Sequence, residues 1–427
     1  MLTLDDARPD DRPGPVSVPT SVPAARPADI GVRFFEITLY VCIASSFFSF
    51  IQPAPYEGIA AILGFACLLA RIPIDVKIMP MVILLTIAEI GGLLSLFPVI
   101  GDADAEKFMF ISVYLAITGV IFGAIMAVNT QRHYDIVSNA YVLAGVIAAI
   151  LGMVGYFKLV PGSDIFMMNA RAVSTFRDPN ITGSFYVPPL LFLAAIFFTS
   201  RVRPLHLISF LIIAIGILLA FSRAAWGQFV MTTILLWVLL FITRPDARAR
   251  SRMVLVMVVM LGILVLLGVI LFSIEDVRKM ILERATLLQA YDTGTEGSRF
   301  NIQQRSIEEI LEHPNGMGPW IFGKTYGLVS HNSYLGMFLN HGWIGGIAYV
   351  ALTLTTLTIG LRAMFARTPW QVPMTAVFAA YVGICFESAI VDTDHWRNYY
   401  LLVGMVWGMA AATTNYQKDM TVKGAPG

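Results

Sequence analysis

Long apolar runs, separated by short clusters of charged residues, dominate this sequence. A helix needs about 20 apolar residues to cross the hydrocarbon core of a bilayer. Lipid offers no hydrogen-bond partner to a free backbone N–H or C=O group, so a run of this length folds as a helix. The runs also lack the alternating polarity of membrane-barrel strands. We count about twelve spans, at residues 33–52, 57–71, 78–97, 108–128, 136–157, 183–200, 205–221, 225–243, 253–273, 342–362, 372–390 and 398–415.

Composition agrees with an all-α, polytopic integral membrane protein. Charged residues make up 13% of the chain, about half the share found in an ordinary soluble protein. With a net charge of +1, the chain lacks the excess of basic residues that is typical of nucleic-acid-binding proteins. The three cysteines, Cys42, Cys67 and Cys385, lie inside apolar runs. In such runs cysteine is usually a small core residue, so we expect neither a disulfide framework nor a zinc site.

The ends of the chain and its basic residues predict its orientation. Residues 1–29 contain six prolines among scattered Asp and Arg, which predicts a disordered cytoplasmic tail without a cleavable signal peptide. Residues 30–415 would form the transmembrane domain and residues 416–427 a cytoplasmic C-terminal tail. With the N-terminus inside, more than half of the 29 Lys and Arg residues fall on the cytoplasmic side, as the positive-inside rule requires. We therefore predict a multi-pass protein of the bacterial inner membrane with both termini cytoplasmic.

The two longest connections, residues 158–182 and 274–341, then face the outer side, where long ordered loops are usually functional. Arg223 stands in FSRAAWGQF at the outer junction of two spans, a position where the positive-inside rule disfavours a cation. It either snorkels to the lipid headgroups or binds an anion. Arg177 precedes Asp178 and Pro179, which we interpret as the N-cap and first turn of the next helix. Arg177 itself is left without a structural explanation.

The loop 274–341 contains two further groups of polar residues. Arg299 would begin a helix, where a cation is unfavourable against the helix dipole unless an anion binds there. Gln303 shares the face of Arg299, whereas Arg305 is expected to pair with Glu308 or Glu309 at the surface; Arg299 is open to the same surface interpretation. Further on, His331 and Asn332 open a short apolar helix that we expect along the membrane interface, and Gly342 then lets the chain turn into the next span. A histidine can accept a proton at neutral pH, but taken alone the pair favours a helix-capping or interfacial histidine, and His341 is interpreted as structural.

Acidic residues offer a competing site. Asp102 and Asp104 form a D-x-D pattern that could hold Mg²⁺ or Mn²⁺ against a diphosphate, or simply cap the following helix. A second outer cluster precedes the last span and could pair with the arginines or bind sugar hydroxyls; its members are Glu387, Asp392, Asp394 and His395.

The order of these motifs resembles the O-antigen ligase / O-antigen polymerase superfamily. The resemblance covers roughly residues 170–360: DPN before a span, an S-R pair at the next outer turn, and a long loop with G-S-R, E-H-P-x-G-x-G and H-N-S-Y-L before a Gly-rich span. It implies about twelve transmembrane helices with a large periplasmic loop after the ninth, the fold of membrane glycosyltransferases. It also implies an undecaprenyl-diphosphate-linked glycan as donor, and an inverting substitution that needs neither metal nor cofactor. The family's diphosphate-binding arginines correspond to Arg223 and Arg299, and its catalytic histidine to His331.

We therefore predict glycosyl transfer to an acceptor hydroxyl on the periplasmic side, in exopolysaccharide or O-antigen polymerisation. The catalytic residues would be His331, Arg223 and Arg299, and the substrate-binding residues Arg177, Asn332, Gln303 and Arg305. Partners would be the donor lipid, a polysaccharide acceptor and membrane lipids. An O-antigen ligase that transfers glycan to lipid A-core is the alternative within the family. Outside it stand a metal-dependent transferase and a multi-span transporter or flippase, which would use mid-span ionisable residues such as Glu36 and Glu89.

Overall fold

The computed structural model describes residues 27–51, 53–244, 246–284 and 299–422, and most of them are helical. The only strands of the described part form a small antiparallel hairpin, β1 (Met167–Met168) with β2 (Arg171–Ala172). Four 3₁₀-helices are described, η1 (Ser45–Phe47), η2 (Val76–Ile78), η3 (Phe97–Val99) and η4 (Ser163–Phe166). The α-helices are α1 (Pro27–Ala44), α2 (Pro55–Leu69), α3 (Met79–Leu96), α4 (Ala103–Ala127), α5 (Thr130–Tyr156), α6 (Pro179–Thr199), α7 (Pro204–Leu219), α8 (Arg223–Thr243), α9 (Ala247–Phe272), α10 (Glu275–Arg284), α11 (Arg299–Glu312), α12 (Ile321–Tyr326), α13 (Ser333–Met364), α14 (Gln371–Ser388) and α15 (Arg397–Val422).

Each of the twelve predicted spans coincides with a helix, and the all-α, polytopic fold is confirmed. Eight helical stretches of the described chain are long and apolar enough to cross a membrane; they contain α1, α3, α4, α5, α6, α8, α9 and α13. Two apolar helices, α2 and α7, are shorter. The remaining two predicted spans coincide with α14 and α15. That all twelve cross the bilayer stays a prediction.

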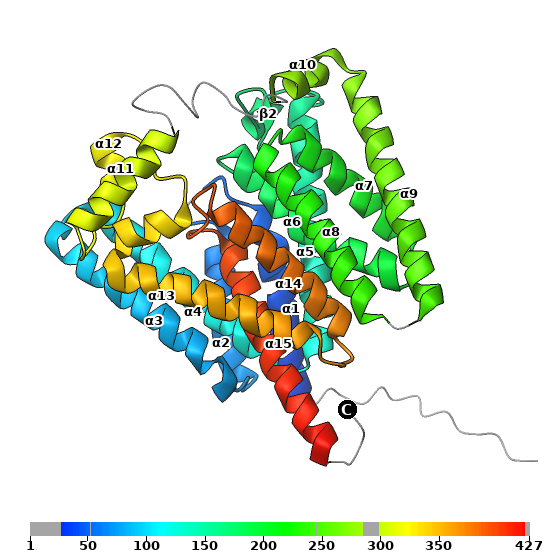
Figure 1. Cartoon of the computed structure of the whole chain (residues 1–427), viewed down its shortest axis with the longest axis horizontal. Helices are drawn as coiled ribbons and strands as arrows, with labels where there is room; N and C mark the ends of the chain where they lie inside the picture. The colour runs from blue at the N-terminus through cyan, green and yellow to red at the C-terminus, as the bar shows by residue number, and fades with distance from the viewer. Residues whose placement is uncertain (1–26, 52, 245, 285–298, 423–427) are drawn as a thin grey trace, which may run out of the picture.

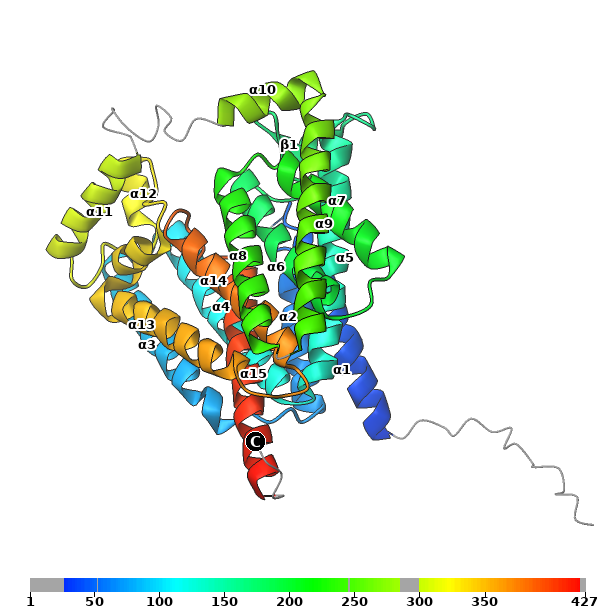
Figure 2. The same ribbon diagram turned by 45° about the vertical axis from the view of Figure 1, so that its right-hand side comes forward.

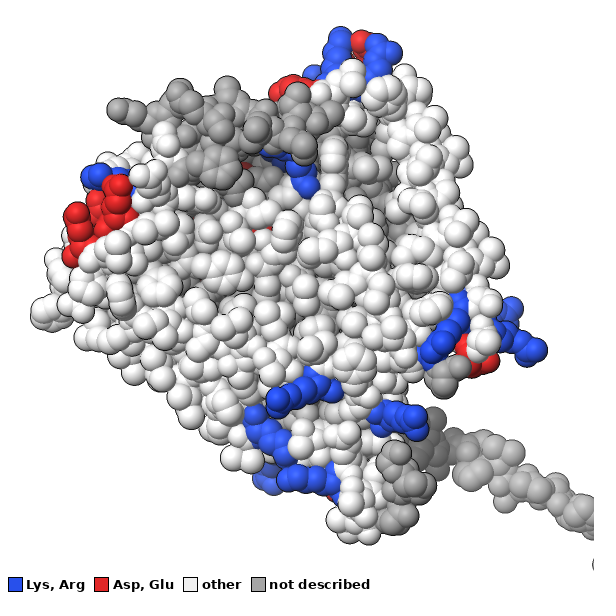
Figure 3. All heavy atoms as spheres, viewed as in Figure 1, with Lys and Arg blue, Asp and Glu red and all other residues white. Residues whose placement is uncertain are grey.

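The connecting elements and the chain ends lie at opposite ends of the bundle. Helices α10, α11 and α12 and the β hairpin gather at one end, and the start of α1 and the end of α15 lie at the other (Figures 1 and 2). On the face drawn in Figure 3, charged side chains of the described residues concentrate at these two ends, with an almost uncharged band between them. Such a band is what a bilayer-spanning surface requires. The predicted tail at 1–29 lies outside the described residues except for 27–29, with which α1 begins.

The core is built around α6, whereas α9 lies at the periphery. In α6, 89% of an 18-residue window is buried, against 11% in α9. Helix α6 contacts α5, α7, α8 and α14, so its N-terminus is surrounded by protein at the loop end. Helix α9 presents a row of exposed aliphatic side chains, among them Leu255, Val258 and Leu266. These side chains fit a surface in contact with lipid tails.

Glycines let the most closely packed helices approach at backbone distance. At the crossing of α3 and α13, a Cβ on Gly91 would lie 2.6 Å from the backbone nitrogen of Gly345. At the crossing of α4 and α15, a Cβ on Gly404 would lie 2.9 Å from the backbone nitrogen of Gly123. Hydrophobicity gives no drive for association between helices in lipid, so close packing through small residues is the usual solution.

Helix α13 is bent at Gly342, as the sequence predicts. Gly342 adopts φ +65° and ψ −173°, which interrupts the helix between a short first segment, 333–341, and a long second one. A Cβ at this position would lie 2.7 Å from the carbonyl carbon of Asn315, so glycine is required both by conformation and by space. His331 and Asn332 directly precede the short segment and lie at the loop end of the bundle.

Candidate active site at the loop end of the bundle

Arg223 is the first residue of α8, at the turn that joins α7 to α8. Phe221 makes this turn with φ +46°, and Ser222 caps α8 by accepting a hydrogen bond from the backbone of Ala225. The Ser222 hydroxyl also donates to the side-chain oxygen of Asn180 on α6, at 2.8 Å. The predicted position of Arg223 at a junction of two spans is confirmed, and this network fixes the turn that presents it.

Arg171 anchors the same turn from the loop 158–182, and sequence reasoning missed it. Its Nε donates to the carbonyl of Ala220 at 2.9 Å, and its Nη2 donates to Asn180 at 3.3 Å. Only 9% of Arg171 is exposed, so removing its cation would leave these acceptors in a partly dry environment. Nothing in its sequence context distinguishes it from the other arginines of the outer loops.

His331 lies directly before α13, in the left-handed backbone conformation with φ +49°. Its Nδ1 is 3.7 Å from Oδ2 of Asp392, in the connection between α14 and α15. This is the separation of a loose ion pair rather than a hydrogen bond. The other oxygen of Asp392 accepts hydrogen bonds from Ser330 Oγ and the backbone N–H of Asn332, both at 3.2 Å. The carboxyl group is therefore fixed to both residues that flank His331.

Asp392 is a candidate site residue whose partner the sequence did not identify. The pattern placed it in an acidic outer cluster without a specific partner, whereas the structure places its carboxyl beside His331. Desolvation and the nearby Asp394 carboxyl raise the pKa of Asp392 to about 7. A carboxyl next to Nδ1 orients an imidazole ring and leaves Nε2 facing a substrate, as in hydrolase triads.

The connection between α14 and α15 is tied firmly to the start of α13. Ser333 donates to the carbonyl of Val391 at 3.1 Å, and the backbone N–H of Thr393 donates to Ser333. Asn332 caps α13, since its side-chain oxygen accepts from the backbones of Tyr334 and Leu335. Its amide nitrogen donates to the carbonyl of Ala389. Both polar atoms of Asn332 thus have protein partners, and substrate binding by this residue stays a prediction.

The three site residues predicted on α11 differ in what the structure says of them. Arg299 is the first residue of α11, and its side chain lies outside the described part of the chain. Gln303 is half-buried on the same helix. Arg305 is exposed and donates to Glu308 at 3.1 Å and to the hydroxyl of Tyr326 at 3.2 Å. The predicted surface pairing of Arg305 with Glu308 is confirmed, while its role toward substrate stays a prediction.

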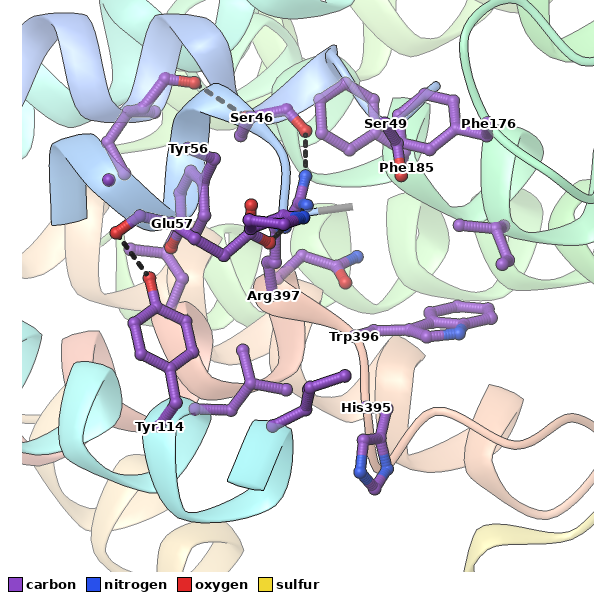
Figure 4. A pocket seen from close by; sticks show the side chains of 18 of the residues that line it. Ser46, Ser49, Tyr56, Glu57, Tyr114, Phe176, Phe185, His395, Trp396 and Arg397 are labelled. Carbon is purple, nitrogen blue, oxygen red and sulfur yellow. Dashed lines mark hydrogen bonds and ion pairs between the residues drawn. The ribbon is translucent and has the colours of Figure 1, made fainter. Parts of the chain in front are cut away.

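Arg177 lies in a different environment, at the rim of a cavity. The predicted capping is confirmed: Asp178 accepts a hydrogen bond from the backbone of Asn180 at 2.7 Å, and Pro179 is the first residue of α6. Arg177 is exposed and lines a cavity of about 620 Å³ enclosed by α2, α4, α6 and the start of α15. Figure 4 shows Phe176 and Phe185 on one side of this cavity and Tyr114 on the other.

The D-x-D carboxylates are compensated by a lysine. Lys324 Nζ lies 2.6 and 2.7 Å from the two oxygens of Asp102 and 2.9 Å from Asp104. The hydrogen bond from Lys324 lowers the pKa of Asp102, which also caps α4. A divalent cation at this position would have to displace Lys324. Elsewhere in the described chain, Glu309, Glu312 and His313 bring ligand atoms within 4.8 Å of one another on the outer part of α11.

The two mid-span carboxylates that a transporter would use both have protein partners. Glu36 pairs with Arg132 on α5. Glu89 accepts a hydrogen bond from Ser112 at 3.0 Å, and Ser112 lies 3.3 Å from Nε2 of His341, which is fully buried. Neither carboxylate lines the cavity beside Arg177.

These features define a polytopic α-helical membrane protein whose arginine and histidine–aspartate groups are collected at the loop end. Residues 208–350, about one third of the chain, match a family model described as O-antigen ligase. A search of curated proteins found no match. The resemblance to the O-antigen ligase and polymerase superfamily is thereby confirmed, and it supports glycosyl transfer of this general type. The matched segment includes Arg223, Arg299 and His331, whereas Arg177 and Asp392 lie outside it.

Proposed function

We propose that this protein transfers a glycan from an undecaprenyl-diphosphate-linked donor to an acceptor hydroxyl, and so polymerises an exopolysaccharide or O-antigen repeat. The reaction would take place at the periplasmic face of the inner membrane. The observation that best supports this proposal is the His331–Asp392 pair, held at the loop end of a bundle in which residues 208–350 match the O-antigen ligase model.

In the proposed reaction, Nε2 of His331 takes the proton of the acceptor hydroxyl. The freed oxygen forms a bond to the anomeric carbon of the donor from the face opposite the diphosphate. The bond between that carbon and the diphosphate oxygen breaks, and its electron pair stays on the departing lipid diphosphate. The proton passes from His331 to solvent, and the anomeric configuration is inverted.

The arginines would supply the electrostatic part of catalysis. The leaving diphosphate gains negative charge in the transition state, and a planar guanidinium binds phosphate oxygens in a bidentate manner. Arg223 at the first turn of α8 also lies where the helix dipole favours an anion. Arg299 would contribute a second cation from the start of α11. Cations fixed before the reaction stabilise this charge without reorganisation, so the proposal requires no metal ion.

The test uses purified full-length protein, a lipid-linked repeat unit and EDTA. We expect longer glycan chains with release of lipid diphosphate, and loss of both with His331→Ala. His313→Ala is the matched control, because His313 is exposed in the same outer region and faces Glu309 rather than Asp392. Full product from His331→Ala would refute the proposed role. Dependence on added Mg²⁺ would favour the acidic site, and transfer to lipid A-core alone would identify a ligase.

A further inference from the structure

The cavity beside Arg177 has the composition of a lipid site rather than of a sugar site. Its wall is mostly apolar and includes Phe110 and Leu115 of α4, Phe185 of α6 and Leu401 of α15. Phe110 is 74% exposed, so this wall continues onto the exposed surface of α4. Its volume of about 620 Å³ lies within the range of about 300–1,000 Å³ that is typical of ligand pockets.

The polar groups inside the cavity neutralise one another. Arg397 donates to Glu57 at 3.0 Å and to the carbonyl of Phe48 at 3.2 Å. The hydroxyl of Tyr114 donates to the carbonyl of Glu57 (Figure 4). The guanidinium of Arg397 also lies over the ring of Tyr56, 4.9 Å from its centroid. These contacts pair the charge of Arg397 with that of Glu57 at the inner polar wall.

The rim differs, because its two cations are not balanced. Lys107 and Arg177 both line the cavity and are exposed. Within the described part of the chain, neither side chain makes a hydrogen bond or ion pair. An apolar interior with two cations at its outer rim is complementary to an amphiphile with an apolar chain and an anionic head.

Two structural elements separate this cavity from the proposed catalytic residues. In the first turns of α6, Asn180 faces Ser222 beside Arg223, whereas Ile181 and Phe185 face the cavity. In the connection before α15, Asp392 faces His331, whereas Trp396 faces the cavity. A ligand in the cavity would therefore lie on the side of α6 opposite the turn that presents Arg223.

We propose that this cavity binds the polyprenyl chain of the acceptor glycolipid, with its phosphate held by Lys107 and Arg177. The chain binds by burial of apolar surface, and the phosphate by attraction to the two rim cations. Assignment to the acceptor rests on the proposed function, because polymerisation requires a second lipid-linked substrate beside the donor. Binding of a polyprenyl phosphate does not depend on catalysis and can be measured alone.

The first experiment measures binding with the full-length protein in phosphatidylcholine nanodiscs. The probe is undecaprenyl phosphate with a photoreactive group in its chain, and the readout is cross-linking to cavity residues. Gly58 of α2 lines the cavity, and a Cβ there would meet no atom within 4 Å. Gly58→Trp should therefore fold, occupy part of the cavity and reduce cross-linking by about tenfold. Gly262→Trp is the matched control, since Gly262 of α9 has the same open space away from the cavity.

The second variant tests the rim. Lys107→Gln combined with Arg177→Gln should weaken binding of the phosphate by about 20- to 30-fold. Undecaprenol lacks the phosphate, so its own affinity for the cavity should be the same in the rim variant as in the wild type. Unaltered cross-linking in both Gly58→Trp and the rim variant would overturn the proposal. Equal competition by phosphatidylglycerol would also overturn it, because the cavity would then bind any anionic lipid.

A transfer assay separates this inference from the proposed function. Gly58→Trp should raise KM for the acceptor with little change in kcat, whereas His331→Ala should abolish kcat. If His331→Ala is inactive but Gly58→Trp has the wild-type KM and wild-type binding, only the cavity assignment fails. If His331→Ala remains active while Gly58→Trp loses binding, the proposed function fails and the lipid site stands.

Discussion

The crossing of α3 and α13 allows a quantitative test, because replacing Gly91 with alanine puts one methyl group against backbone. Its Cβ would lie 2.6 Å from both the nitrogen of Gly345 and the carbonyl oxygen of His341. Neither atom can move by a change of rotamer, so the helices must separate locally by about 0.8 Å to restore ordinary contact. Overpacking of this kind costs about 1–3 kcal/mol. Alanine recovers about 0.5–1 kcal/mol of helix propensity, so at the middle of both ranges the net loss of stability is about 1 kcal/mol.

Gly119→Ala is the matched control at the crossing of α4 and α15. Its Cβ would meet Tyr400 at 3.5 Å, an ordinary contact, so the gain in helix propensity should make this variant neutral or slightly stabilised. We expect the apparent midpoint of thermal unfolding in detergent to be about 1–3 °C lower for Gly91→Ala than for Gly119→Ala. Both variants must be heated at the same rate, since unfolding in detergent is commonly irreversible. A Gly91→Ala protein as stable as the control would refute this account of helix packing.

Three further predictions concern the loop end. Asp392→Asn should lower kcat for transfer by about 10- to 100-fold with little change in KM, because the imidazole loses its orienting charge; an unchanged kcat would contradict the pairing with His331. The raised pKa of Asp392, about 7, means that the folded protein binds this proton more tightly than the unfolded chain. The resulting stabilisation is complete at low pH and is lost as pH rises from about 4 to 7. Over this range the free energy of unfolding of the wild type should therefore fall by about 1–3 kcal/mol relative to that of Asp392→Asn. Unfolding midpoints at pH 5 and pH 8 test this, and a constant difference between the two proteins would exclude it. Finally, the double variant Asp102→Asn with Asp104→Asn should keep a transfer rate within about threefold of the wild type, because asparagine caps a helix about as well as aspartate. Loss of activity in this variant would instead support the metal hypothesis.

Much of the local structure could be predicted because its causes lie within a few residues along the chain. The apolar runs specified the helices, since the bilayer requires about 20 apolar residues in helical form. Asp178 with Pro179 marked the start of α6, and Gly342 marked the bend in α13. The boundaries differ by several residues, as α15 extends to Val422 beyond the predicted span. Fraying and capping geometry set such ends, and hydropathy does not report them.

The candidate site was only partly predictable, because its contacts join residues that are far apart in sequence. Asp392 lies 60 positions from Asn332, whose backbone donates to it. Arg171 reaches Ala220, and Lys324 compensates Asp102. In each case the sequence showed a charge in an outer loop but not its partner, so Asp102 could be interpreted as a metal ligand and Asp392 as one of an unassigned cluster. The spacing of apolar residues along the chain does not indicate which distant charged residues will pair.

The sequence by itself determined the class of this protein: an all-α membrane bundle with long connecting loops and arginine, histidine and aspartate residues in them. The tertiary structure decided which of those residues meet, how the α14–α15 connection holds Asp392 beside His331, and where an apolar cavity opens between α2, α4 and α6. The physical reason is that hydropathy and capping act locally. Ion pairs and cavities depend instead on how distant helices cross, and at backbone contact those crossings are set by single glycines such as Gly91 and Gly404.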